Sequence, residues 1–95
     1  MNAYSPLLDV KLPDEEIAVI KSVIEKHRTR GNVDFHQLRT RKSGNFRYVD
    51  LHLEVPPSMT VQESHDICDL IEKEIKSNMN FTEITIHVEP KPWKN

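Results

Sequence analysis

The stretch that decides the fold is FRYVDLHLEV, residues Phe46–Val55. Apolar and polar side chains alternate along it, which is the period of a strand with one face buried. The buried face would carry Val49, Leu51, Leu53 and Val55, and the wet face Tyr48, Asp50, His52 and Glu54. Pro56 and Pro57 stop the strand, because proline cannot continue a hydrogen-bonded ladder. The sequence therefore predicts a half-buried strand with an acidic and histidine-containing open face.

The segments on either side predict two helices and two further strands. The connector Lys42–Asn45 contains a glycine suited to a hairpin turn, so a strand over Val33–Arg41 should pair with Phe46–Val55. Apolar residues at helical spacing predict helices over Leu12–His27 and Thr60–Asn78, and alternation predicts a last strand over Phe81–Glu89. The order helix, strand, strand, helix, strand predicts an α+β sandwich whose helices cover one face of a three-stranded sheet.

Helix-start signals support both helices. Pro13 suits the first helical position, and the acidic residues after it complement the positive end of the helix dipole. Thr60 and Glu63 form a Thr-x-x-Glu capping box at the start of the second helix. Gly31 is placed to end the turn that follows the first helix.

Composition limits the class of protein. Ninety-five residues make one small domain, for which a partner subunit or a bound metal would supplement the stability of a modest core. Thirteen basic and 15 acidic residues give a net charge of -2, which argues against non-specific nucleic-acid binding. The one cysteine, Cys68, falls on the apolar stripe of its helix and is expected to pack in the core of a protein from a reducing compartment. No apolar run approaches the length of a membrane span.

Four of the five histidines lie in or beside the predicted sheet and the second helix. His87 and Glu89 lie two apart on the last strand and share its open face, where His52 of the middle strand can join them. His36 belongs to the first strand, whose weak alternation leaves its direction open, and His65 belongs to the second helix. Imidazole and carboxylate ligands without a thiolate suit Zn²⁺ best, with Mn²⁺, Fe²⁺, Co²⁺, Ni²⁺ and Cu²⁺ disfavoured.

A plainer interpretation of the histidines stands beside this one. A single surface histidine usually binds nothing, and the chain has no HExxH or paired CxxC motif that would be specific on its own. His27 at the end of the first helix reads as structural, and Arg39 and Arg41 could line a solvated edge.

Longer segments carry a family resemblance. FHQLRTRKSGNFRYVDLHLEVPPSMTVQESHDICDLIEKEI followed by ITIHVEP resembles the cytoplasmic C-terminal domain of cation diffusion facilitator transporters. The resemblance covers Leu12 to Pro90, and its markers HQLRTR, DLHLEV, ESHDICDLIEKEI and IHVEP follow in the family's order and spacing.

The resemblance implies a fold, a partner and a function. The fold is ferredoxin-like and similar to metallochaperones, without their CxxC, and two copies form a V-shaped homodimer. Residues 1–11 would be a lead-in after a membrane domain, residues 12–90 the dimerisation and metal-binding domain, and residues 91–95 a flexible tail. Such domains lie at the cytoplasmic face of the membrane, where divalent metal favours a closed dimer that promotes transport. Family members export Zn²⁺ most often, and some export Mn²⁺, Fe²⁺, Co²⁺ or Cd²⁺.

The resemblance also implies a ligand set. The family's ligand positions correspond to His36, His52, His65 and His87, with His65 offered to the metal of the opposite subunit. Glu89 stands where an aspartate is commoner, which keeps the charge and adds one methylene. Arg39 and Arg41 correspond to family arginines that look like contacts to the membrane-domain side or the interface.

Other functions remain open on the sequence. A metal-independent dimerisation module would have the same fold and partners. A hydrolytic metalloenzyme needs an open coordination position inside a pocket, which so short a chain hardly offers, so no enzyme is expected. A soluble metallochaperone is disfavoured by the missing CxxC.

Overall fold

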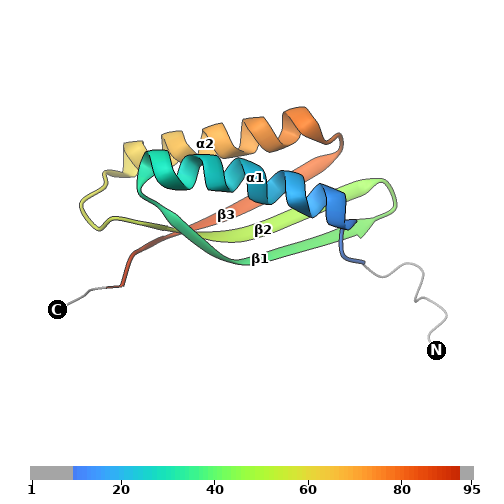
Figure 1. The fold of residues 1–95 in the computed structure, drawn as a ribbon, viewed down its shortest axis with the longest axis horizontal. Coiled ribbons are helices and arrows are strands. Elements are labelled where there is room, and N and C mark those ends of the chain that lie inside the picture. The colour runs from blue at the N-terminus through green and yellow to red at the C-terminus, as the bar shows by residue number, and fades with distance from the viewer. Residues whose placement is uncertain (1–9, 93–95) are drawn as a thin grey trace.

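A computed structural model describes residues 10–92 of the chain. The elements are α1 (Asp14–Gly31), β1 (Asp34–Ser43), β2 (Phe46–Val55), α2 (Val61–Asn78) and β3 (Thr82–Pro90). Figure 1 shows both helices on one face of the sheet, with the other face open. The predicted α+β order is confirmed. Within residues 10–92 no helix combines the length and the apolar character needed to cross a membrane.

The sheet is mixed, with strand order β1-β2-β3. β1 and β2 form the expected antiparallel hairpin, and β2 and β3 run parallel. Parallel strands need a long crossover, and α2 supplies it between β2 and β3. The register sets His52 opposite His36 on one side and opposite His87 on the other. All three side chains therefore share one face of the sheet.

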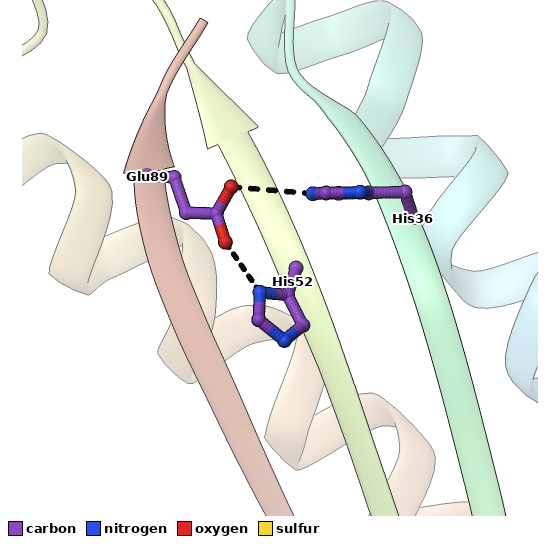
Figure 2. A group of neighbouring side chains, drawn as sticks. All are labelled: His36, His52 and Glu89. Carbon is purple, nitrogen blue, oxygen red and sulfur yellow. Dashed lines mark hydrogen bonds and ion pairs between the residues drawn. The ribbon is translucent and has the colours of Figure 1, made fainter.

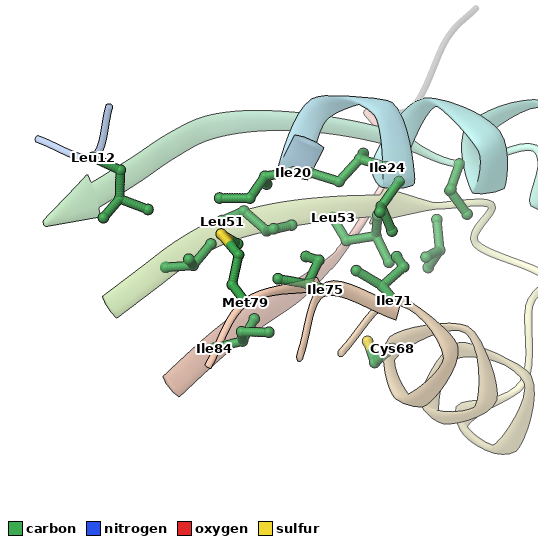
Figure 3. Close-up of a cluster of buried hydrophobic side chains, with 14 residues drawn as sticks. Leu12, Ile20, Ile24, Leu51, Leu53, Cys68, Ile71, Ile75, Met79 and Ile84 are labelled. Carbon is green, nitrogen blue, oxygen red and sulfur yellow. The ribbon is translucent and has the colours of Figure 1, made fainter. Parts of the chain in front are cut away.

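The core lies between the helices and the sheet (Figure 3). Its most enclosed side chains come from α1, β2 and α2, each at most 1% exposed: Ile20, Ile24, Leu51, Leu53, Ile71 and Ile75. Burying one aliphatic side chain of this size contributes about 1.5–3 kcal/mol. Since every second residue of β2 belongs to this layer, the residues between them are held on the open face.

Helix α1 runs four residues past the predicted end at His27. Its cap is Asn32, at φ 55, whose backbone N–H donates to the carbonyl of Arg28. The left-handed position is therefore Asn32 and not the glycine before it, which is consistent with the tolerance of asparagine for this conformation. The predicted capping box of Thr60 and Glu63 is present at α2.

The first strand is longer and less regular than predicted. β1 continues to Ser43, so that Gly44 at φ 61 and Asn45 alone make the turn. A β-bulge interrupts β1 between His36 and Arg39, and Gln37 adopts φ 55 there. The extra residue allows Phe35 and Leu38, three apart, both to pack against the core.

The expected lead-in and tail fall mostly on residues 1–9 and 93–95, outside the described part. At the edges of that part, Val10 forms a bridge with Lys42, and the backbone N–H of Lys91 donates to Val55 at 2.8 Å. The Lys91 ammonium lies 3.4 Å from Asp34.

Candidate metal centre

Three side chains from three strands converge on the open face of the sheet. Figure 2 shows the carboxylate of Glu89, on β3, directed toward His52 of β2 and His36 of β1. One carboxylate oxygen of Glu89 lies 3.2 Å from Nε2 of His36, and the other contacts Nδ1 of His52. The histidine rings meet edge to face with centroids 5.3 Å apart. Candidate ligand atoms of all three residues lie within 4.8 Å of one another.

A second group adjoins the first and shares His52 with it. It consists of Asp50, His52 and His87, whose candidate ligand atoms also lie within 4.8 Å of one another. Asp50 Oδ1 lies 3.1 Å from Nε2 of His87. That oxygen is buried, and it has no hydrogen-bond partner among residues 10–92 because the contact to His87 lacks hydrogen-bond geometry. A carboxylate oxygen and an imidazole nitrogen placed side by side are two types of ligand that zinc accepts.

The local geometry depends on the bulge in β1. His36 precedes the bulge and pairs with His52, so its ring stays on the open face. The direction of His36, which the sequence left open, is thereby settled. β3 contributes Glu89, which pairs with Glu54 two residues beyond the His52–His87 pair and therefore lies on the same face.

Carboxylates balance the histidines of the site. The hydrogen bond from His52, followed by that from His36, lowers the pKa of Glu89 below its ordinary value, against the opposing effect of burial. Glu54 adds a second carboxylate 3.6 Å from Nε2 of His36. An ionised Glu89 is the form that accepts these bonds and the form that would coordinate a cation.

The donor set fits a zinc-type ion. Tetrahedral zinc holds nitrogen and oxygen ligands at about 2.0–2.2 Å, which separates neighbouring donors by roughly 3.4 Å. The Glu89–His36 distance of 3.2 Å already matches this separation. The three side chains are 28–40% exposed, so an ion can reach them from solvent. The geometry offers two adjacent places for an ion with His52 between them.

The comparison with protein families then decides the relationship. The profile described as "Cation efflux protein, cytoplasmic domain" matches residues 12–91. The chain belongs to this family, the cation diffusion facilitators.

Individual members agree with this cation diffusion facilitator assignment. The chain is 38% identical, over 94% of its length, to the cation-efflux pump FieF of Pectobacterium atrosepticum. It superposes on the zinc form of CzrB, a protein assigned to zinc transport, with a TM-score of 0.74, 32% identity and coverage of 93% of this chain and 99% of that one. It also superposes on the metal-bound C-terminal domain of the CzcD transporter from Thermotoga maritima, with a TM-score of 0.73 and 29% identity. That alignment covers 85% of this chain and 93% of the other.

The curated relatives are longer than this cation diffusion facilitator domain. The chain spans 29% of the FieF pump and 30% of a transporter from Synechocystis sp., to which it is 35% identical over 96% of its own length. By name these relatives are cation transporters.

His65, the remaining predicted ligand, lies apart from the cluster. Its ring sits on α2, 66% exposed, with Nε2 3.2 Å from a carboxylate oxygen of Asp69. α2 covers the opposite face of the sheet from the histidine cluster (Figure 1). One copy of the cation diffusion facilitator domain therefore brings together His36, His52, His87 and Glu89 but not His65.

Asp50 is a candidate ligand that the sequence analysis places on the open face of its strand but does not include in the ligand set. Its position two residues before His52, on the same polar face, was the signal that could have identified it. Cys68 is buried, and burial first, then the charges of Glu72 and Asp69, raises its pKa to about 11. The neutral thiol packs in the core as predicted and is no ligand of this site.

Proposed function

We propose that the chain is the metal-sensing cytoplasmic domain of a divalent cation exporter, with zinc as its principal ion. In this proposal residues 12–90 form the sensor of a longer transporter, at the cytoplasmic face of a membrane domain that precedes them. The observation that carries this proposal is the convergence of Glu89 on His36 and His52 from three different strands.

The ligand chemistry supports zinc over harder ions. Each group offers two imidazoles and one carboxylate, a set that favours zinc and other late divalent metals over Mg²⁺ or Ca²⁺. The similarity to the zinc form of CzrB points the same way. Mn²⁺, Fe²⁺, Co²⁺ and Cd²⁺ remain candidates within the proposal.

A homodimer that shares the site is supported by an exposed apolar patch. Val61 on α2 is 85% exposed and Val88 on β3 is 43% exposed, and both line a shallow groove that includes Glu89. His65 lies one helical turn after Val61 and so faces the same side of α2. A second copy seated on this patch would bring its own His65 toward the cluster and complete the coordination.

The proposed mechanism follows from ligands that two subunits share. Metal binds a closed dimer, in which His65 of the partner subunit reaches the cluster, more tightly than an open one. Only this difference in binding free energy can shift the equilibrium between the two arrangements. Closure of the dimer signals to the membrane domain that metal is present in the cytosol. The affinity of the closed dimer for metal sets the concentration at which transport is promoted.

Zinc titration of the 95-residue chain tests the proposal. Saturation at about 100 times Kd should add about 2.7 kcal/mol of stability, which raises the Tm on the order of 10 °C for a domain of this size. Small-angle scattering should show the dimer contracting as zinc is added. No change in Tm and no change in scattering would exclude a metal sensor.

A matched pair of variants ties the effect to the site. Glu89→Gln removes the carboxylate that joins two histidines, and the zinc-induced Tm shift should fall by more than half. Glu83→Gln makes the same change on the same face of β3, outside both groups of candidate ligands, and should leave the shift unchanged.

A metal-independent dimerisation module is the second candidate. Glu89 already satisfies both His36 and His52, so the cluster can hold itself together without an ion. In that case His52→Ala and His87→Ala would leave dimer shape and Tm insensitive to zinc, as in the unaltered chain.

A further inference from the structure

The open face of the sheet has a second half at the β1–β2 hairpin, away from the histidines. We call it the hairpin-end patch, and its residues are Arg39, Arg41, Phe46, Tyr48 and Phe81. Phe46 stacks on Tyr48 with centroids 5.4 Å apart and lies 6.5 Å from the ring of Phe81. Phe81 is 63% exposed and Phe46 40% exposed. Large aromatic side chains left in water at one end of a small domain mark a contact surface.

Arginines complete the patch. The guanidinium of Arg41 lies 4.3 Å above the ring of Tyr48, which holds its charge flat against the aromatic surface. Arg39 lies two residues earlier and lines, with Arg41 and Tyr48, a hollow of about 410 Å³, whose wall also includes the carboxylates of Asp50 and Glu83. Arg47 adds no net charge, because its Nε and Nη2 atoms donate to the two carboxylate oxygens of Glu16, each at 2.8 Å.

The combination of residues favours a lipid surface over a protein. Aromatic rings concentrate at the headgroup level of membranes, and arginines beside them are attracted to anionic lipids. The segment entering the domain runs beside the patch, since Val10 pairs with Lys42 and the N–H of Leu12 donates to Thr40. This step rests on the proposed function, in which a membrane domain precedes the chain.

We propose that the hairpin-end patch contacts the anionic lipid headgroups of the membrane's cytoplasmic leaflet. The net charge of -2 for the whole chain opposes such binding, and so do Asp50 and Glu83 beside the arginines, so the attraction acts only at contact and is sensitive to salt. The patch and the histidine cluster then occupy separate halves of one sheet face. A change in the angle between two subunits would alter the contact between the patch and the membrane.

Vesicle co-sedimentation in the presence of EDTA tests the contact without any contribution from metal. The chain should bind mixed phosphatidylcholine–phosphatidylglycerol vesicles at low salt, lose that binding at high salt, and ignore vesicles of phosphatidylcholine alone. Arg39→Gln should weaken binding about fivefold, the contribution of one basic residue near an anionic surface. Phe81→Asn should weaken it severalfold and should still fold, because asparagine accepts the φ of 51 at this position.

Matched controls remove the same groups at other places. Leu70→Gln and Arg30→Gln change exposed helical residues outside the patch and should bind as the unaltered chain does. Absence of binding to anionic vesicles at low salt would overturn the proposal, and so would patch variants that bind normally. Loss of dimerisation by Phe81→Asn in the absence of vesicles would assign the patch to a second copy and overturn it as well. Because EDTA is present throughout, a failed zinc titration and a failed lipid contact are separate results.

Discussion

The imidazole rings of His52 and His87 stack on neighbouring parallel strands, with centroids 4.6 Å and planes 21° apart. Two protonated rings at this distance would repel each other, whereas two neutral rings can each direct a nitrogen to a cation. His52 belongs to both candidate ligand groups and His87 to one. The two stacked rings should therefore differ in what their loss does to metal binding.

Replacing His52 should weaken binding at both candidate sites, whereas replacing His36 or His87 should weaken binding at only one of them. We expect His52→Asn to abolish zinc binding measured by calorimetry, because it removes a ligand from both groups. His36→Asn and His87→Asn should each lower the stoichiometry or affinity of one class of site. Equal losses in all three variants would contradict two adjacent sites.

Zinc affinity should fall as the solution is made more acidic, because a protonated imidazole cannot coordinate a metal ion. The carboxylate of Glu89 stays ionised in mildly acidic solution, because the hydrogen bond from His52 lowers its pKa further from an already acidic value of 4.5. The loss of binding therefore reflects protonation of the imidazoles. Competition titrations with a chromophoric chelator, repeated in steps of about half a pH unit from about pH 8 to about pH 5.5, would measure the zinc affinity at each pH. A flat profile would contradict histidine ligation.

The ion pair between Glu16 and Arg47 should make the free energy of unfolding decrease at low pH. The hydrogen bond from Arg47 lowers the pKa of Glu16 below 4.5, so the folded state holds the ionised carboxylate more strongly than the unfolded chain does. This contribution is complete above pH 4.5 and is lost as the pH falls through the folded-state pKa. Glu16→Gln should lower the Tm at neutral pH, and the difference from the unaltered chain should shrink in acid.

The neighbouring helix position provides the control for Glu16. Glu15→Gln removes an equivalent charge from the first turn of α1, but Glu15 is exposed, and the carboxylate that pairs with Arg47 is that of Glu16. Its Tm difference should be small and should not follow that of Glu16→Gln. A matching pH dependence in both variants would attribute the effect to the helix dipole instead.

Cys68 should be unreactive in the folded protein. Burial raises its pKa to about 11, so at neutral pH hardly any reactive thiolate is present and reagents cannot reach it. Labelling with a disulfide reagent should require unfolding, and its rate should follow denaturant concentration. Rapid labelling without denaturant would show that α2 opens locally.

The backbone of Gln37, in the bulge of β1, should be mildly strained, and a glycine at this position should relieve that strain. Gln37 adopts φ 55, which glycine accepts at lower cost than a side chain with a Cβ. Gln37→Gly should therefore keep or raise stability, by up to about 1 kcal/mol, in urea denaturation. Thr85→Gly on β3, where φ is not positive, should destabilise the domain. A loss for Gln37→Gly similar to that for Thr85→Gly would contradict strain at the bulge.

The sequence predicts the parts of this fold that repeat a simple period. The alternation of β2 and the capping box at Thr60 are visible as patterns, and both are present in the structure. The end of α1 is predicted at His27, where the apolar stripe stops, but the helix continues to Gly31, and Asn32 rather than Gly31 takes the left-handed position. No local signal distinguishes the two, since both residues tolerate that conformation.

The site was predictable in outline but not in its contacts. His87 and Glu89 share a face as their spacing indicates, yet Glu89 reaches across to His36 while His87 approaches Asp50. These partners depend on the parallel register of β2 and β3, which tertiary packing sets. The role of His65 depends on a second chain, about which the spacing of residues in one chain carries no information.

The bulge at Gln37 also governs the direction of everything that follows it on β1. His36 and Arg39 differ by an odd number of positions, so in a regular strand their side chains would leave opposite faces. With one extra residue between them, His36 pairs with His52 and Arg39 pairs with Asp50, and both side chains lie on the open face. A single inserted residue thus reverses the alternation of side chains between the two faces of the strand. Deleting it would turn the arginines inward or the histidine away, so that the two halves of the face could no longer occur on the same strand.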